Sequence, residues 1–298
     1  MSLMLAYYEQ KFEVAFLRAK AEAFQEFFER LMGLAYKFDF MACRPWGKQG
    51  DHKNDGFLQS EKKLFQVYAP NEMTEIKAIK KIQEDFEGAK PYWDHYFNSW
   101  VFVYNGLKLP PHVQKELLTL QNNNPNIAIE TWGLEELRLV FRLLQIQDLE
   151  SWFGYAPTEE TQTKLGFKDL EIVLKTLSDS PLPTMRPVTD VPSGKISANA
   201  LSENVAELLR AGMVKAPLVA DFFNQWHEAT LGERVAESFR AKYESLRDSF
   251  LPNDIFTELQ IWAGGQIRGT PEHELAVLTV IAYYFERCDI FEAPRTMS

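Results

Sequence analysis

The sequence predicts a mixed α/β part followed by an all-α part. In the first half, short runs rich in aromatic and β-branched residues alternate with stretches whose apolar residues recur every three to four positions. Beyond residue 200 only the helical spacing continues. The chain has 298 residues, and domains hold roughly 100–200 residues each. We therefore expect an α/β domain, a mixed sheet flanked by helices, over residues 1–155 and a helical domain over residues 160–298.

The N-terminal stretch, residues 5–36, predicts one long helix or two joined helices. Its apolar residues follow helical spacing, and neither glycine nor proline interrupts them before Gly33. Glu26 and Glu29 border the apolar stripe near its end. Charged residues at the edge of such a stripe are normal on a solvated helix, which is the ordinary interpretation of both acids.

Five short runs predict strands, because they are rich in aromatic and apolar residues and end at turn residues. Helical spacing between them gives the order α-β-β-β-α-β-α-β-α. The strand runs are residues 36–43, 54–58, 64–69, 100–105 and 127–132, and the helical stretches that follow the first helix are residues 72–90, 113–120 and 135–144.

The second half reads as helices joined by loops. Residues 156–164 predict a linker, and the segment 180–194 predicts irregular structure because it holds four prolines. The predicted helices of this half cover residues 167–177, 200–211, 214–226, 231–249, 253–264 and 271–285.

Composition and charge limit the possible functions. Hydrophobic residues make up 46% and charged residues 25%, as in a globular protein. The net charge of −10 excludes a strongly basic nucleic-acid footprint over the whole chain. Residues 1–155 carry 18 Lys/Arg and 21 Asp/Glu, whereas residues 156–298 carry 14 and 21. The acidity lies mainly in the second half, so a local basic groove in the first half stays possible.

Cysteine use and hydropathy predict a cytoplasmic protein. Cys43 and Cys288 are the two cysteines, and their separation matches neither a disulfide framework nor a metal finger. The sequence has no run of 18 apolar residues, so we expect no membrane span. The N-terminus lacks the hydrophobic core of a signal peptide.

A glycine-rich turn with two acids, residues 47–57, runs into a predicted strand. Asp55 begins this strand, and Gln66 is the polar residue inside the next one. Magnesium-dependent phosphodiester hydrolysis needs a few oxygen ligands and often a lysine that polarises the attacking water. Two adjacent strands can present such ligands at one edge of a sheet. Glu29, at the end of the preceding helix, could provide a third oxygen.

Each of these residues also has an ordinary interpretation. Asp55 could be the aspartate of an Asp-Gly turn, and Gln66 could be a solvent-facing strand residue. Asp51 is best interpreted as a turn residue, and we expect His52, a lone histidine in a polar loop, to face solvent. The order of these elements supports the site more strongly than any single residue does.

This order resembles the Mrr-like branch of the restriction-endonuclease-like superfamily, over roughly residues 20–145. The resemblance implies Glu29 as the acid of the helix, Asp55 as the acid at the strand start, and Gln66 in place of a second strand acid. It further implies Mg²⁺ or Mn²⁺ held by Asp55 and Gln66. The implied substrate is nucleic acid, with double-stranded DNA favoured. A homodimer would suit this activity, since cutting both strands needs two sites.

One position departs from the family pattern. The lysine expected two residues after Gln66 is Tyr68, and a tyrosine hydroxyl is uncharged at neutral pH and cannot replace an ammonium. Lys63, Lys77 and Lys80 are the candidates for this role, and we take Lys80 as the catalytic lysine.

The end of the chain resembles the C-terminal domains of ABC-three-component systems. The residues that carry this resemblance are 231–239 and 275–292. These systems are bacterial conflict modules in which an ABC-type ATPase accompanies a small middle protein and an effector-like third protein. The resemblance implies that residues 160–298 contact protein partners. Glu286, Asp289 and Glu292 form an acidic helix end beside Cys288, for which an interaction surface or an exposed terminus is favoured over metal chemistry. The Trp226-His227-Glu228 trio is best interpreted as packing.

These observations together predict a metal-dependent nuclease that acts as the effector of a bacterial defence system. The alternative is a catalytically inactive protein that keeps the nuclease fold and acts as a nucleic-acid-binding or protein-interaction adaptor. Tyr68 and the acidic charge favour that alternative. A small-molecule enzyme has no phosphate loop or nucleophile motif here to support it.

Overall fold

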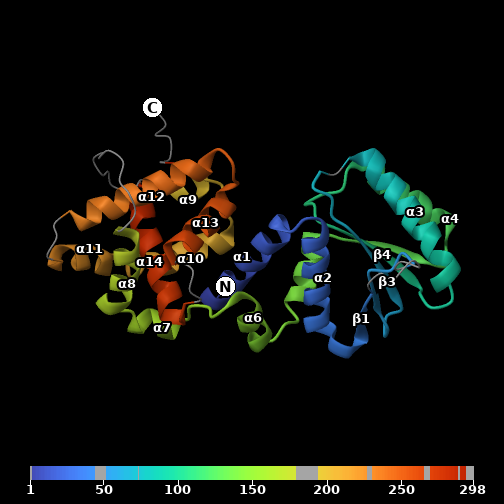
Figure 1. The fold of residues 1–298 in the computed structure, drawn as a ribbon, viewed down its shortest axis with the longest axis horizontal. Helices are drawn as coiled ribbons and strands as arrows, with labels where there is room; N and C mark the ends of the chain where they lie inside the picture. Colours follow the sequence, from blue (N-terminus) through green and yellow to red (C-terminus); the bar gives the residue numbers. More distant parts are fainter. Residues whose placement is uncertain are drawn as a thin grey trace. The chain divides into compact units, whose positions relative to one another are not determined.

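The computed structural model describes residues 2–43, 52–72, 74–178, 194–226, 230–264, 269–287 and 289–292. The chain divides into two compact units, one of residues 15–148 and one that combines residues 1–14 with residues 149–298. Figure 1 shows the ribbon of both units. The domain ranges 1–155 and 160–298 stay a prediction, because compactness alone does not show which ranges fold independently.

The unit of residues 15–148 contains a mixed five-stranded sheet, as the sequence predicts. Its strands follow chain order in space: the first three are antiparallel, and the last two each run parallel to the preceding strand. The strands are β1 (Phe40–Ala42), β2 (Gly56–Leu58), β3 (Lys63–Tyr68), β4 (Ser99–Tyr104) and β5 (Ala128–Trp132).

Helices cover both faces of this sheet (Figure 1). On one face, Leu64 of β3 lies in a buried cluster with residues of α3 and α4. On the other face, Phe65 packs against Phe28 of α2, with ring centroids 5.4 Å apart. This alternation follows from the two-residue period of a strand. The helices of this unit are α2 (Ala21–Tyr36), α3 (Glu75–Trp93), α4 (Pro111–Asn123) and α5 (Leu134–Phe141).

The N-terminal stretch forms two joined helices, α1 (Leu3–Arg18) and α2, the second of the two forms predicted. The break falls at Ala21, whose φ is +46° and whose N–H donates to the carbonyl of Ala69, 2.6 Å away. A positive φ is costly for a residue with a Cβ, and the tie to the end of β3 holds the turn in place. The start of α2 is therefore anchored to the sheet.

The C-terminal region is helical, as predicted. Its centre is α14 (Pro271–Glu286), which is buried along almost its whole length between α8, α10, α11 and α13. A helix that is apolar on all sides belongs in a protein core. The other helices of the region are α6 (Ile146–Phe153), α7 (Glu159–Lys164), α8 (Phe167–Ser178), α9 (Lys195–Ala198), α10 (Glu203–Met213), α11 (Ala216–Gln225), α12 (Leu231–Arg247) and α13 (Pro252–Gly264).

The structure corrects two local predictions. The predicted linker 156–164 contains α7, because Thr158 caps this helix by accepting from the N–H of Thr161. The predicted strand 36–43 is shorter, since residues Lys37–Asp39 form a 3-10 helix before β1.

Some predictions fall on residues that the structure does not describe. These are the prolines of the segment 180–194, together with Asp51, His227, Glu228 and Cys288. Within the described residues, no helix combines the length and apolar character that crossing a bilayer would require.

Candidate functional site

The β2–β3 hairpin brings Asp55 and Gln66 face to face. Gly56 pairs with Phe65, and the N–H of Asp55 donates to the carbonyl of Phe65 over 3.0 Å. Asp55 therefore lies opposite Gln66 on the same face of the hairpin. Gly56 is needed beside it, because a Cβ there would come within 2.5 Å of the Phe40 ring. The Asp-Gly pair thus lets β1 and β2 approach closely where the acid emerges.

The Asp55 carboxylate is buried and receives several hydrogen bonds. Its Oδ2 accepts from the Nε2 of Gln66 at 2.6 Å and from the N–H of Val67 at 2.7 Å. Asp55 is 5% exposed and Gln66 is 3% exposed. This burial excludes the interpretation of Gln66 as a solvent-facing strand residue.

The amide oxygen of Gln66 has no hydrogen-bond partner among the described residues. A buried polar atom left without a partner costs about 1–3 kcal/mol, and most such atoms in folded proteins are satisfied. The Gln66 amide thus presents an acceptor beside the carboxylate of Asp55, in a place where a bound cation or an ordered water would satisfy it.

Glu29 joins this pair through Gln25, one turn earlier on α2. The Nε2 of Gln25 lies 3.2 Å from Oε1 of Glu29 and 3.4 Å from Oδ1 of Asp55. The three oxygen donors predicted from the sequence, Glu29, Asp55 and Gln66, are therefore brought together. Sequence reasoning did not identify Gln25, although its position four residues before Glu29 places both on one face of the helix.

Tyr68 lies on the same face of β3 as Gln66, but its side chain packs against the buried cluster that Leu64 forms with residues of α3 and α4. Its ring centroid is 5.8 Å from that of Phe102. Burial raises the pKa of the Tyr68 hydroxyl, so this side chain carries no charge at neutral pH. It cannot supply the positive charge of the lysine that it replaces.

Two of the candidate lysines, Lys63 and Lys80, form ion pairs, but with carboxylates other than that of Asp55. Lys63 Nζ lies 2.9 Å from Glu61 and 3.1 Å from Glu130. Burial lowers the pKa of Lys63, but its hydrogen bonds to these acids raise it, and the net pKa lies above its usual value. Lys80 is 73% exposed, with its Nζ 3.5 Å from Glu84. Lys77 is exposed on the same helix, α3.

The residues that lead into Asp55 form a strained turn held by α3. His52 and Lys53 have φ values of +52° and +62°, a backbone region that is costly for residues other than glycine. The Nε1 of Trp93 donates to the carbonyl of His52 at 3.2 Å. Lys53 Nζ lies 2.9 Å from Asp85, which is fully buried and also binds Lys81.

His52 is only partly exposed. Its ring lies over that of Tyr92, with centroids 3.9 Å apart, so it is held against the C-terminal end of α3. Sequence reasoning placed it in solvent and did not identify Asp85, Tyr92 or Trp93. Their role depends on how α3 packs beside the turn, and local sequence patterns do not indicate that packing.

The donor set suits a hard divalent cation. The described residues contain no cluster of three or more His, Cys, Asp or Glu side chains with metal-binding geometry. Mg²⁺, however, is usually held by one or two carboxylates, with waters and substrate phosphates completing its shell. Asp55 and the Gln66 amide oxygen, with Glu29 nearby, fit that pattern.

The acidic residues that follow α14 form ion pairs with arginines of the helical region. Asp289 is 5% exposed and binds Arg240, and Glu292 lies 3.2 Å from Arg247. Burial raises the pKa of Glu286. In α11, Phe222 stacks on the Trp226 ring with centroids 4.9 Å apart, which agrees with a packing role for Trp226.

Comparison with protein families identifies the second half of the chain. Residues 168–292 match the model of C-terminal domain 10 of the ABC-three component (ABC-3C) systems. No curated protein and no solved structure matches the chain, and the family match does not extend to the α/β unit. Residues 168–292 therefore form a C-terminal domain of this family, and the chain is a component of an ABC-three component bacterial conflict system.

Proposed function

We propose that the α/β unit is a metal-dependent nuclease and that the protein is the effector of its conflict system. The observation that carries this proposal is the buried Asp55–Gln66 pair, in which the Gln66 amide oxygen has no hydrogen-bond partner among the described residues. Gln25 lies within hydrogen-bond distance of both Glu29 and Asp55, so it links Glu29 to the same carboxylate.

Each residue has a role that follows from its chemistry. Asp55 provides the negative charge that holds Mg²⁺ or Mn²⁺, and Gln66 adds a neutral oxygen. A bound divalent cation of this kind stabilises charge on a phosphoryl oxygen and lowers the pKa of water. Glu29 would accept a proton from the attacking water, and Gln25, whose Nε2 lies within hydrogen-bond distance of both carboxylates, would orient them.

Lys80 is our candidate for the positive charge that Tyr68 does not supply. Its pair with Glu84 is exposed, and exposed pairs contribute about 0–1 kcal/mol. Little is therefore lost when the Lys80 ammonium turns from Glu84 towards a phosphate. Lys77 and Lys81 lie on the same helix, so α3 carries several cations for the phosphate backbone of nucleic acid.

Double-stranded DNA is the favoured substrate, cut by a homodimer with one site for each strand. The helical C-terminal region then docks this nuclease onto protein partners of the system. Its acidic balance fits a protein surface better than a phosphate backbone.

The second candidate function is a non-catalytic adaptor with the same fold. Tyr68 favours it, because its side chain is packed against Phe102 and is uncharged. An adaptor of this kind would bind nucleic acid or protein without cutting.

A plasmid assay separates the two functions. Purified full-length protein is incubated with supercoiled DNA and Mg²⁺ or Mn²⁺, alongside Asp55→Asn, Gln66→Leu and Lys80→Ala variants. Asp94→Asn is the matched control, since Asp94 is exposed at the end of α3. The nuclease proposal predicts nicking by the wild type and the control, and a loss of at least about 100-fold in Asp55→Asn, more than removal of an outer-shell partner costs.

Equal nicking by wild type and Asp55→Asn would contradict the proposed site. If neither protein nicks DNA or RNA while a gel-shift assay shows binding of either, the adaptor function replaces the nuclease. Retention of full nicking by Lys80→Ala would assign the lysine role to another residue.

A further inference from the structure

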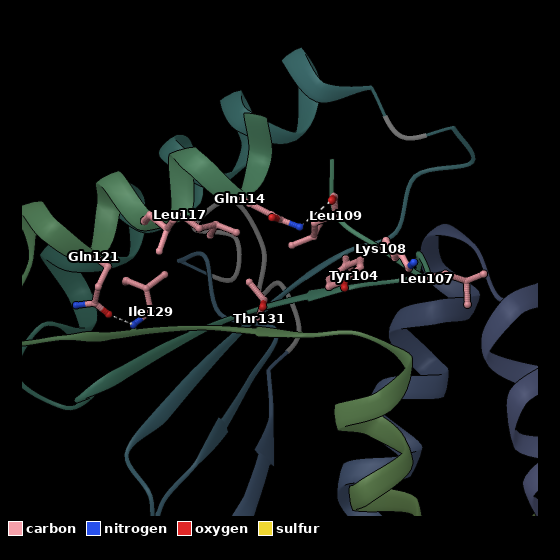
Figure 2. A pocket seen from close by; sticks show the side chains of 10 residues that line it. Tyr104, Leu107, Lys108, Leu109, Gln114, Leu117, Gln121, Ile129 and Thr131 are labelled. Carbon is pink, nitrogen blue, oxygen red and sulfur yellow. Dashed lines mark hydrogen bonds between the residues drawn. The ribbon is translucent and has the colours of Figure 1, made fainter. Parts of the chain in front are cut away.

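A groove lies between β5 and α4, at the end of the α/β sheet. It encloses about 500 Å³, which is within the range of ligand sites in proteins. Figure 2 shows α4 above the strand, with side chains from both elements turned towards the space between them. The groove is lined by Tyr104, Leu107, Lys108, Leu109, Gln114, Leu117, Leu118, Gln121, Ile129 and Thr131.

The strand that floors this groove is at the edge of the sheet. Among the described strands, β5 pairs with β4 alone. The N–H of Ala128 donates to the carbonyl of Asn98 at 2.8 Å, so Ala128 and Glu130 direct their backbone groups towards β4. Because backbone direction alternates along a strand, Ile129 and Thr131 direct theirs away from the sheet.

Gln121 already occupies the first part of this edge. Its Oε1 accepts from the N–H of Ile129 at 2.8 Å, and its Nε2 donates to the carbonyl of Ile127 at 2.9 Å. A side-chain amide offers one acceptor and a donor side by side, as a peptide group does. Gln121 therefore imitates one peptide unit of an added strand, as Figure 2 illustrates for its bond to Ile129.

The next outward groups of β5 lie beside the groove. The carbonyl of Ile129 and the N–H of Thr131 have no hydrogen-bond partner among the described residues. An edge strand with such groups is a template for another extended chain. The groups that a ligand must match are thus one donor and one acceptor with the spacing of a peptide backbone.

The walls of the groove define the side chains that fit. Leu117 and Leu109 form an apolar wall, and Leu118 and Leu107 are 66% and 61% exposed at the rim. Side chains of an added strand alternate between the two faces of the sheet. An apolar side chain of the ligand would enter the groove, and an acidic side chain would meet Lys108 at its end.

We propose that this groove binds a short extended peptide segment of a partner protein, added as a strand to β5. The partner segment carries an apolar residue for the groove and an acidic residue for Lys108. A second copy of the chain fits less well, because Gln121 already takes the N–H of Ile129. Symmetric pairing of two β5 strands would need that group, and the outward groups of Ile129 and Thr131 that remain are too few to join two sheets. This site is independent of the proposed nuclease chemistry, since it uses neither Asp55 nor Gln66.

Selection from a displayed library of random ten-residue peptides tests this proposal on the full-length protein. We expect enriched peptides with a central large apolar residue, a nearby acid and no proline. Binding of a synthetic enriched peptide, followed by fluorescence anisotropy, should weaken at least about tenfold for Leu118→Arg. The matched control Leu139→Arg changes a leucine that is 63% exposed on α5, and it should bind the peptide as the wild type does.

Two further variants test how the peptide binds. Methylation of a backbone nitrogen of the peptide removes one hydrogen-bond donor. Binding should be lost when the methylated nitrogen is one that donates to β5, and it should be retained when the nitrogen of the neighbouring residue is methylated instead. Lys108→Glu should lower the affinity for the acidic peptide and raise it for a version with lysine in place of the acid.

The proposal is overturned if no peptide is enriched, or if enriched peptides bind wild type and Leu118→Arg equally. Insensitivity to every backbone methylation would also overturn it, because the bonds to β5 would then be absent. A concentration-dependent dimer that Leu118→Arg dissociates would show that a second copy, not a partner peptide, occupies the groove.

Discussion

At the scale of single residues, the turn before Asp55 depends on a buried charge in the neighbouring helix. Asp85 is fully buried and holds the ammonium groups of Lys53 and Lys81. Removing one partner of a buried ion pair leaves the others uncompensated. Gly88 on the same helix leaves room for the Lys53 side chain, since a Cβ there would lie 2.9 Å from Lys53 Cγ. Asp85 therefore acts on Asp55 through the backbone of residues 52–54.

The first prediction concerns Asp85→Asn. If the turn positions a metal ligand, this variant should weaken Mn²⁺ binding by about 10–100-fold, as loss of an outer-shell partner does. Titration calorimetry with Mn²⁺ measures this, and circular dichroism at the same temperature checks that the fold is retained. Glu84→Gln, an exposed residue of the same helix, should bind Mn²⁺ like the wild type. An unchanged affinity in Asp85→Asn would remove Asp85 from the site.

The second prediction concerns pH and Glu130. Burial raises the pKa of this carboxyl, but hydrogen bonds from Ser99, Lys63 and Trp132 lower it, and the net pKa is below its usual value. A depressed pKa contributes stability at neutral pH that is lost as the pH falls through the folded-state value, below about 4.5. Glu130→Gln should therefore cost about 1 kcal/mol at pH 7 and less at pH 3.5.

Urea unfolding at both pH values measures this difference. Glu135→Gln is the control, because Glu135 is 72% exposed in a surface pair with Arg138. A loss of equal size at pH 7 and pH 3.5 would show that Glu130 contributes packing and not charge.

Part of the candidate site could be predicted from the sequence. The pairing of Asp55 with Gln66 could be predicted from the sequence, because two successive strands joined by a short polar loop form a hairpin. Glu29 could be added from its place at the edge of a helical stripe. Gln25 and Asp85 could not, since their contacts depend on the angle at which a helix packs against the sheet.

At the scale of elements, the tightest packing in the C-terminal region joins α10 and α14. A Cβ on Gly212 would lie 2.5 Å from the carbonyl oxygen of Leu278 and 2.8 Å from Cβ of Ala282. The glycine thus lets the two helix backbones approach closely. By contrast, Gly33 on α2 is partly exposed and has no atom within 4 Å of an added Cβ.

The third prediction compares these two glycines. Gly212→Ala should destabilise the C-terminal region by about 1–3 kcal/mol, because overpacking forces helices apart. Gly33→Ala should stabilise the α/β unit by about 1 kcal/mol, since alanine is the better helix former. Thermal unfolding of the two variants and the wild type measures both changes. Equal melting temperatures for Gly212→Ala and the wild type would show that α10 and α14 shift at little cost.

Long elements could be predicted from sequence and short ones could not. The strands β3 and β4 and the helix α14 have compositions that fit only one kind of structure. The helices α7 and α9 have six and four residues, too few for apolar periodicity to be seen. The former is defined by its cap at Thr158, in a segment whose proline and charges are typical of a linker.

At the scale of the whole molecule, the first residues of the chain belong with the last. Tyr7 is 2% exposed and donates to Oε2 of Glu274 at 3.0 Å, and Gln10 binds Thr257. Burial raises the pKa of the Tyr7 hydroxyl, which therefore stays protonated as a donor. Residues 1–14, which form most of α1, thus complete the helical unit, whereas the sequence assigned them to the first half.

The fourth prediction follows from this arrangement. Tyr7→Ala should increase amide hydrogen exchange in α13 and α14, about 250 residues away in sequence, because it removes a buried aromatic contact worth about 3–5 kcal/mol. Exchange followed by mass spectrometry locates the change. Phe38→Ala, at a side chain that is 96% exposed, should leave these helices unchanged. Protection of α13 and α14 equal to that of wild type would mean that α1 does not stabilise them.

Binding of a divalent cation by Asp55 and Gln66 can be measured from the electron paramagnetic resonance signal of free Mn²⁺ during titration with full-length protein. We expect one site in the wild type and in Asp94→Asn, and an affinity at least about tenfold lower in Asp55→Asn and in Gln66→Leu. Both ligand variants binding Mn²⁺ as tightly as the wild type would contradict this expectation.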